Sequence, residues 1–291
     1  MKNPVLCPVV DAKNVTAARI IDLAIEKSRQ MPESKMNLIW LEAAGCSGNI
    51  ISLLNADNPG VGYLLKSMVN MTYSNSLMQA EGEMAYEKRA DTLNTEFILV
   101  VEGAAATKDN GNYNIIARHG GRFITALEAI KAAGEKAKYV LAAGTCASYG
   151  GLSAAEPNPS GSVSIDNVLS REVIKVPGCP GHPDWVIGTI AHLLYFGRPE
   201  LDEQNRPVIF YGITIHDRCT RRSYFDRGIF AKKLGDKECM FKIGCRGPAT
   251  KTDCPVRQWN SYVSWPIRDN TPCIGCAQER FPDGMEPFVR Y

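Results

Sequence analysis

The chain has 291 residues, 45% of them hydrophobic, and a formal net charge of +2. A chain of this length can bury enough apolar surface for one large or two moderate domains. Its near-neutral charge, without a long run of like charges, argues against a general nucleic-acid surface and against a polybasic membrane-binding tail. The composition therefore indicates a globular protein without a nucleic-acid partner.

The N-terminal residues form neither a charged-then-apolar signal peptide nor a twin-arginine pair. No segment reaches the roughly 18 consecutive apolar residues of a membrane-spanning helix, so we expect no direct membrane insertion. We therefore expect a cytoplasmic protein that meets a membrane only peripherally, through partners. Disulfides are rare in a reducing cytosol, so the ten cysteines are expected to bind metal instead of forming bridges.

Residues 1–35 are expected to form an N-terminal extension. Its apolar residues Val15, Ala18, Ile21 and Ile25 recur at helical spacing, with charged residues on the remaining face. Cys7 has no motif around it, and a free thiol is its simplest interpretation.

From residue 36 the pattern becomes strand, loop and helix, repeated. Short runs rich in Val, Ile and Leu, typical of buried parallel strands, occupy residues 37–41, 97–101, 139–142 and 173–176, and a last strand is expected at 207–211. Residues 122–136 have one apolar face at helical spacing. This alternation predicts an α/β domain with a doubly wound parallel sheet over residues 36–190. Residues 191–291 change to loops, charges and cysteines, and are expected to form a second, mostly irregular domain.

Three cysteines follow predicted strands directly, in glycine-rich loops: Cys46, Cys146 and Cys179. Ligands of such sheets bind beyond the carboxyl ends of the strands, so the three thiols should converge at one edge. Glycines let backbone amides approach closely and hydrogen-bond cluster sulfides. A structural cysteine would explain one loop equally well, and a nucleophile would need a paired histidine. Three thiols at matching strand ends favour an iron-sulfur cluster.

A second group offers one nitrogen and three sulfurs, from His216, Cys219, Cys239 and Cys245. It fits an iron-sulfur cluster whose potential is raised by a neutral imidazole, and it fits a Cys3His zinc site equally well.

A third group, Cys254, Cys273 and Cys276, supplies only three thiolates, with Pro266 between them and no evident fourth ligand. Three ligands suit a three-iron cluster better than structural zinc, and this group favours iron-sulfur chemistry for the whole chain.

These motifs resemble the small, electron-transferring subunit of nickel-iron hydrogenases, over about residues 36–281. The segments that carry the resemblance are Gly45-Cys46-Ser47-Gly48, Val101-Glu102-Gly103, Gly144-Thr145-Cys146, Pro177-Gly178-Cys179-Pro180, Gly244-Cys245-Arg246-Gly247-Pro248 and Pro272-Cys273-Ile274-Gly275-Cys276.

The resemblance implies a flavodoxin-like domain followed by an irregular cluster-binding domain. It assigns Cys46, Cys146 and Cys179 to a proximal cluster. It assigns His216, Cys219, Cys239 and Cys245 to a distal 4Fe-4S cluster. It assigns Cys254, Cys273 and Cys276 to a medial 3Fe-4S cluster, with Pro266 at the open vertex.

The chain departs from this family pattern at Asn49, where many members have a second proximal cysteine. The proximal cluster is then 3Fe-4S, or 4Fe-4S with a water, an amide oxygen or a carboxylate as the fourth ligand. Losing one thiolate charge should raise its reduction potential. A simpler interpretation makes Asn49 a turn residue that only faces the cluster.

The implied function is the relay of electrons, released by dihydrogen oxidation, from the partner's nickel-iron centre through three clusters to a redox protein or small-molecule acceptor. The hydrogenase large subunit is an obligate partner, because a cluster at the open sheet edge needs a cover that excludes water, and a dimer of heterodimers is a further expected assembly. The alternatives are a dihydrogen-sensing regulatory complex and a zinc-stabilised binding protein without a redox role.

Two polar features near these groups allow two interpretations each. Arg218, Arg221 and Arg222 either dock an acidic redox partner or serve as a solvated face or as hydrogen-bond donors to sulfides. His182 either donates to a sulfide or is a satisfied turn histidine, and we favour the second.

Overall fold

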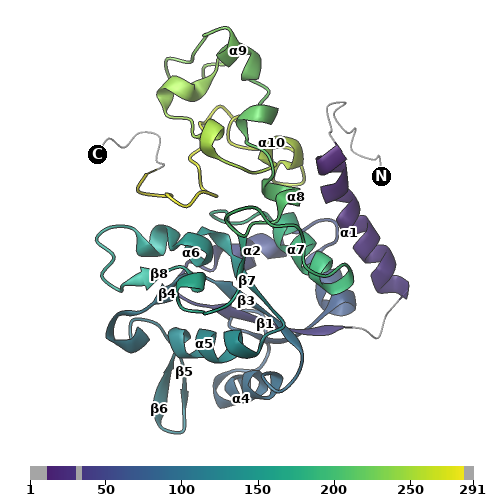
Figure 1. Cartoon of the computed structure of the whole chain (residues 1–291), viewed down its shortest axis with the longest axis vertical. Coiled ribbons are helices and arrows are strands. Elements are labelled where there is room, and N and C mark those ends of the chain that lie inside the picture. The colour runs from purple at the N-terminus through teal and green to yellow at the C-terminus, as the bar shows by residue number, and fades with distance from the viewer. Residues whose placement is uncertain (1–11, 31–34, 285–291) are drawn as a thin grey trace.

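The computed structural model describes residues 12–30 and 35–284. An α/β part with a central sheet forms one end of the molecule in Figure 1, and the cysteine-rich C-terminal part stands beyond the sheet edge where α2 and α6 lie. Cys7 lies outside the described residues, as do the side chains of Val15 and Ala18.

The central sheet has five strands, all parallel, in the order β2-β1-β3-β7-β9. They are β1 (Met36–Glu42), β2 (Val69–Ser74), β3 (Phe97–Glu102), β7 (Tyr139–Ala143) and β9 (Ile174–Val176). This order is that of a doubly wound, flavodoxin-like sheet, in which the chain reverses direction across the sheet between its first and third strands. The predicted fold class is confirmed, and the crevice for a ligand falls between β1 and β3.

Successive residues of the strands enter two separate cores. Trp40, Ile98 and Val100 pack on one face, against α2 (Gly48–Leu54) and α7 (Pro183–Tyr195). Leu41 and Leu99 pack on the other face, against α5 (Ala126–Lys136). Both faces are covered, so β3 is buried along its whole length and its sequence is almost continuously apolar.

Several further elements complete the α/β part. They are α3 (Val61–Tyr63), α4 (Gly82–Thr92) and α6 (Gly144–Tyr149), with two short antiparallel ladders, β4 (Ala105–Ala106) with β8 (Ser162–Val163), and β5 (Ile115–His119) with β6 (Arg122–Thr125). The C-terminal part contains α8 (Val208–Tyr211), α9 (Arg222–Asp226) and α10 (Cys254–Arg257), joined by turns.

Two predicted elements differ from the structure. The helix expected at 122–136 begins only at Ala126, because the Thr125 hydroxyl accepts a hydrogen bond from the Glu128 amide at 3.2 Å and caps it. The strand expected at 207–211 is wrong, since α8 occupies these residues. Pro207 begins this helical turn, and its carbonyl accepts from the Tyr211 amide at 3.0 Å.

The N-terminal helix α1 (Ala12–Gln30) packs against α7 and α8. Its residues Ile21 and Ala24 are buried, and the Ser28 hydroxyl lies 2.6 Å from that of Tyr63. The segment expected to be an extension therefore covers one face of the α/β part (Figure 1).

The core continues from the sheet into the cysteine-rich part. Trp185 and Tyr211 belong to the same buried cluster as Cys245, Cys254 and Trp265. Residue 190, where the sequence places the domain boundary, lies inside α7, which runs unbroken to Tyr195. The two parts thus share apolar contacts along the edge that carries the cysteine loops.

Candidate metal centres

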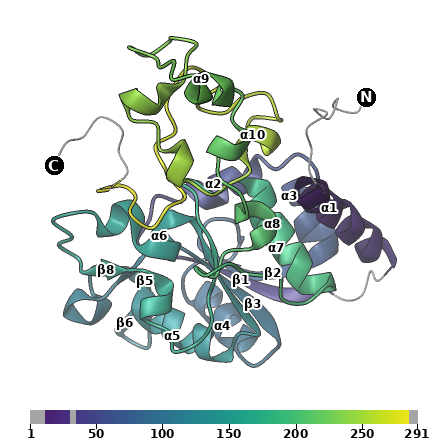
Figure 2. The same ribbon diagram turned by 45° about the horizontal axis from the view of Figure 1, so that its top comes forward.

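The three strand-end cysteines lie at the same edge of the sheet. Cys46 follows β1 and is exposed, Cys146 lies in α6 directly after β7, and Cys179 follows β9. Burial raises the pKa of the Cys179 thiol to about 12, and the neighbouring Cys146, Cys276 and Cys46 thiols add to the increase. The structure thus brings the predicted proximal thiols close enough to interact. Figure 2 shows α2 and α6 beneath the C-terminal part, at this edge.

Asn49 lies in the first turn of α2 and is buried. Its Nδ2 donates to Glu102 Oε1 at 3.2 Å, and its Oδ1 accepts from the Gly181 amide at 2.8 Å. Both ends of the side-chain amide are therefore engaged by protein groups. Asn49 is more than a turn residue, because it links the Cys46 loop to the end of β3 and to the Cys179 loop.

Glu102 ends β3 and is 1% exposed. Its carboxylate accepts from the Asn49 amide at 2.6 Å, from Asn49 Nδ2, from the Ile50 amide at 3.0 Å and from Trp40 Nε1 at 3.1 Å. Burial raises its pKa, and the hydrogen bonds from Asn49 and Trp40 oppose that increase. A carboxylate has about four acceptor positions, so this one is fully used.

Gly144 brings the Cys146 loop against the same asparagine. It has φ +83°, and a Cβ atom there would lie 2.3 Å from Asn49 Nδ2. No side chain fits at this position without displacing Asn49.

Thr145 joins the Cys146 and Cys179 loops to Cys276. Its amide donates to the Gly178 carbonyl at 2.9 Å, and its Oγ1 accepts from the Gly178 amide at 2.9 Å. The same hydroxyl donates to the carbonyl of Cys276. Thr145 therefore attaches the cysteine-rich part to the sheet edge.

The predicted distal ligands line one cavity. His216, Cys219, Cys239 and Cys245 surround it together with Phe241. Backbone amides point at two of the sulfurs, Arg221 N at 3.4 Å from Cys219 Sγ and Gly247 N at 3.5 Å from Cys245 Sγ. Burial, reinforced by the Arg222 charge, lowers the pKa of His216 and favours the neutral imidazole that binds metal.

Arg221 has a structural role beside this cavity. It is buried, and its guanidinium donates to the carbonyls of Asp236 and Glu238 and to the Asn270 amide oxygen. Of the two interpretations given for Arg221, docking of a partner does not hold, since its guanidinium is occupied by backbone carbonyls and Asn270 in the protein interior.

The predicted medial thiols are buried in the C-terminal part. Burial raises the pKa of Cys254 to about 12 and also raises that of Cys273. The Gly275 amide lies 3.4 Å from Cys273 Sγ, and Thr252 Oγ1 lies 3.3 Å from Cys254 Sγ. Pro266 lies in an exposed turn, and its role at an open vertex stays a prediction.

Cys276 lies between two of the groups. It follows the medial Cys273 by three positions, and its carbonyl accepts from Thr145 beside the proximal Cys146. Burial raises the pKa of Cys276, and a hydrogen bond from the Cys179 backbone opposes the increase.

The donor chemistry fits iron-sulfur clusters. The nine described cysteines are free thiols, and iron-sulfur clusters are held by thiolates whose potentials depend on hydrogen bonds to sulfur. Among residues 12–30 and 35–284, no three His, Cys, Asp or Glu side chains are grouped so as to hold a single metal ion.

His182 is a satisfied histidine, as favoured from the sequence. Its Nδ1 accepts from the Asp184 amide at 3.1 Å, and its Nε2 lies 2.7 Å from the Gln258 carbonyl oxygen, which requires the neutral Nε2–H form. Burial, with the Arg257 charge, lowers its pKa to about 4.

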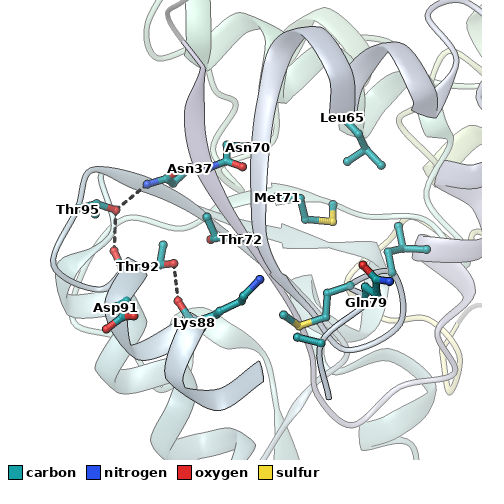
Figure 3. A pocket seen from close by; sticks show the side chains of 13 residues that line it. Asn37, Leu65, Asn70, Met71, Thr72, Gln79, Lys88, Asp91, Thr92 and Thr95 are labelled. Atoms are coloured by element: carbon teal, nitrogen blue, oxygen red, sulfur yellow. Dashed lines mark hydrogen bonds between the residues drawn. The ribbon is translucent and has the colours of Figure 1, made fainter. Parts of the chain in front are cut away.

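An open hollow of about 640 Å³ lies away from these centres, beside the edge strand β2 and α4 (Figure 3). Its lining includes Asn37, Met71, Lys88 and Thr95 but no cysteine or histidine. We therefore do not include it in the candidate centres.

Two family models match the chain and together define its class, the small subunit of a redox enzyme. The model for the C-terminal part of the NiFe/NiFeSe hydrogenase small subunit matches residues 211–289, and that of the 20 kDa subunit of NADH ubiquinone oxidoreductase matches residues 46–193. The chain belongs to the family of nickel-iron hydrogenase small subunits. It is thus part of a hydrogenase whose catalytic centre lies in the large subunit.

Individual relatives agree with this family. The periplasmic [NiFeSe] hydrogenase small subunit of Desulfomicrobium baculatum is 38% identical, with 87% of each chain covered. The quinone-reactive Ni/Fe-hydrogenase small chain of Wolinella succinogenes is 35% identical, over 87% of this chain and 73% of that one. The H2-activated [NiFeSe] hydrogenase of D. baculatum superposes with a TM-score of 0.83 at 36% identity, covering 87% of this chain and 98% of that one.

These relatives overturn the expected cytoplasmic location, since several of them are periplasmic or quinone-reactive. The expectation rested on the N-terminal residues, which show neither a signal peptide nor a twin-arginine pair, and on the lack of a long apolar segment. Neither observation fixes the compartment of the protein. Within the described part of the chain, no helix is both long and apolar enough to cross a membrane.

Sequence reasoning missed the roles of Glu102 and Thr145. Both residues stand in segments that carry the family resemblance, and Glu102 is also the single charged residue of an otherwise apolar strand. Their contacts could not be predicted, because partners such as Gly178 and Cys276 are distant from Thr145 in sequence.

We expect Gly144→Ala to destabilise the protein far more than Gly121→Ala. Both glycines have φ near +80°, but a Cβ at Gly121 meets nothing within 4 Å. The shared backbone strain costs about 1–2 kcal/mol, and overlap with Asn49 should add about 1–3 kcal/mol. Thermal unfolding of both variants checks this, and equal losses would contradict it. Because the two sites are in contact, Asn49→Ala should cost less stability in the Gly144→Ala background than in wild type.

We expect the protein to lose stability as the pH falls into the mildly acidic range, because His182 must then bind a proton. Its pKa is lower in the folded state than its ordinary value near 6.5, so the unfolded chain binds the proton more tightly. The stability present above pH 6.5 is therefore lost as the pH falls toward 4, by about 2 kcal/mol at pH 5. Denaturant unfolding at pH 7.5 and pH 5 checks this in wild type and His182→Gln. Identical pH dependence in the two proteins would count against the assignment.

Proposed function

We propose that this chain relays electrons from the large subunit's nickel-iron centre to an external acceptor through three iron-sulfur clusters. The supporting observation is a continuous series of contacts between the three groups. Thr145, next to Cys146, donates to the Cys276 carbonyl, and the amide of Arg246, next to Cys245 on the distal cavity, donates to the Cys273 carbonyl at 2.7 Å. Each iron-sulfur cluster would supply a site that takes up and releases one electron.

The protein groups around each thiol set would hold and tune these clusters. Thiolates bring negative charge, and amides such as Arg221 N and Gly247 N stabilise it through hydrogen bonds to sulfur. The neutral His216 would remove one negative charge from the distal set, which raises its potential relative to four thiolates.

The proximal set would have three thiolates, from Cys46, Cys146 and Cys179. The Asn49 amide oxygen accepts from Gly181, and the Glu102 carboxylate already accepts four hydrogen bonds. Neither group is therefore available as a fourth ligand without breaking the links between the loops. This favours a 3Fe-4S cluster or a 4Fe-4S cluster completed by water.

The large subunit would cover the proximal set. Cys46 is exposed, and so are the apolar residues Ile51, Leu54 and Leu152 on α2 and just after α6. An exposed apolar surface around a cluster-binding loop favours a tightly bound partner that excludes water. A dimer of heterodimers stays a prediction from the sequence.

Low-temperature electron paramagnetic resonance on the purified native complex tests the relay. We expect the oxidised sample to show two 3Fe-4S signals if the proximal cluster lacks a fourth ligand, or one such signal with two reducible 4Fe-4S clusters if water completes it. All clusters should become reduced under dihydrogen. The absence of any iron signal would overturn the proposal.

We expect Asn49→Cys to lower the midpoint potential of the proximal cluster by on the order of 100 mV, because an added thiolate makes the cluster harder to reduce. A redox titration followed by electron paramagnetic resonance measures the shift. Asn49→Ala is the control, since it removes the same hydrogen bonds without adding charge. An unchanged or raised potential in Asn49→Cys would refute the charge argument.

A further inference from the structure

Aromatic side chains lie beside the cavity of His216 and its three cysteines. Phe241 lines this cavity and is also 46% exposed, so one ring reaches from the candidate ligands to the surface. Phe225 stacks edge-on to His216 at 4.4 Å and to Phe241 at 5.4 Å between ring centres. The surface around Phe241 is therefore in direct contact with the lining of this cavity.

The segment that carries this ring, residues 227–242, also exposes apolar and basic side chains. Ile229 and Leu234 are 41% and 53% exposed. The exposed basic residues of the same segment are Arg227, Lys232, Lys233, Lys237 and Lys242, and Lys242 Nζ lies 4.7 Å from the centre of the Phe230 ring, which packs against Phe241. We call these five basic residues, together with Ile229, Leu234 and Phe241, the Phe241 patch. A merely solvated charged face does not require three exposed large apolar side chains, whereas a docking surface combines an apolar centre with a charged rim.

The local charge is strongly positive. Residues 216–246 contain nine Lys or Arg and four Asp or Glu, a net charge of +5. The whole chain carries only +2, so the remaining residues sum to −3.

The acidic residues of this segment are largely engaged by neighbouring groups. Asp226 pairs with Arg222 at 2.8 Å, and Asp236 accepts from the backbone amides of Lys232 and Lys233. The exposed lysines of the patch therefore make the electrostatic potential positive at the surface that an approaching partner meets.

We propose that the Phe241 patch docks a small acidic electron-carrier protein, which takes electrons from the centre held by His216. This rests on the proposed electron relay. One electron leaves the reduced relay, the oxidised carrier gains it, and no covalent bond forms or breaks. The opposite charges accelerate the encounter, and the apolar centre excludes water beside Phe241.

An anionic membrane surface is the other occupant with suitable charge. Membrane-surface binding relies on a long amphipathic helix with a broad apolar face. Here α9, the helix of this segment, has only five residues and offers no such face. The structure therefore favours an acidic protein.

The test uses one haem carrier in two charge states, so that the redox partner stays the same. Basic c-type cytochrome is compared with the same cytochrome made acidic by succinylation of its lysines. The complex with the large subunit is given dihydrogen, and the rate of haem reduction is measured at low salt and at 1 M salt. An uncharged dye serves as a third acceptor that reports only whether the relay works.

We expect the acidic cytochrome to be reduced at least tenfold faster than the basic form at low salt. The difference should vanish at 1 M salt, where the screening length is about 3 Å. The double variant Lys233→Glu/Lys237→Glu should lose this preference while it reduces the dye at the wild-type rate. Lys233→Gln/Lys237→Gln should lose part of it.

The matched control is Lys131→Glu/Lys136→Glu, which makes the same charge change on α5, at the far side of the sheet from the C-terminal part (Figure 1). It should keep the preference for the acidic cytochrome. An equal loss in the control, or a wild-type preference for the basic form, would overturn the docking proposal.

A vesicle assay tests the other occupant. If the complex sediments with phosphatidylserine vesicles, if Lys233→Glu/Lys237→Glu abolishes this sedimentation, and if the cytochrome preference is unchanged, membrane binding replaces the docking proposal. Failure of the wild-type complex to reduce the dye would instead overturn the relay itself.

Discussion

The side-chain amide of Asn49 holds the sheet edge together. It donates to Glu102 at the end of β3, accepts from Gly181 in the Cys179 loop, and packs against Gly144 in the Cys146 loop. Three segments far apart in sequence are thereby fixed relative to one another by one buried polar group. Buried hydrogen bonds of this kind are costly to leave unmade, so the three loops must adopt one mutual arrangement. Asn49 offers no thiolate to a cluster, but it has a clear structural role at this position.

Much of the α/β part is predictable from the sequence, because buried parallel strands leave continuous apolar runs. The four strands read from such runs agree with β1, β3, β7 and β9, whereas β2 has exposed and half-buried positions and left a weaker pattern. The run at 207–211 was misassigned because short apolar segments have no diagnostic period. The cysteines were found from their motifs, but Thr145 and Glu102 act through contacts that only the fold creates.

The two ends of the proposed relay lie in different electrostatic surroundings. Cys46 is exposed at the sheet edge among apolar side chains, whereas the cavity of His216 lies beneath a basic surface. Positive charge near a cluster would stabilise its reduced form. The proposed proximal and distal sets each have three thiolates, so the basic surface is the feature that distinguishes the two ends, and it would favour electron movement away from the sheet edge.

The core shared by the sheet and the C-terminal part has a consequence for assembly. Cys254 and Cys273 are only 8% and 6% exposed and pack in the same cluster as Trp185 and Trp265. Iron bound by these thiols would contribute its binding energy to folding, because the thiols converge only in the folded chain. Metal loading and folding of this part of the protein would then be coupled, and the cluster would have to be in place before the thiols are closed off from solvent.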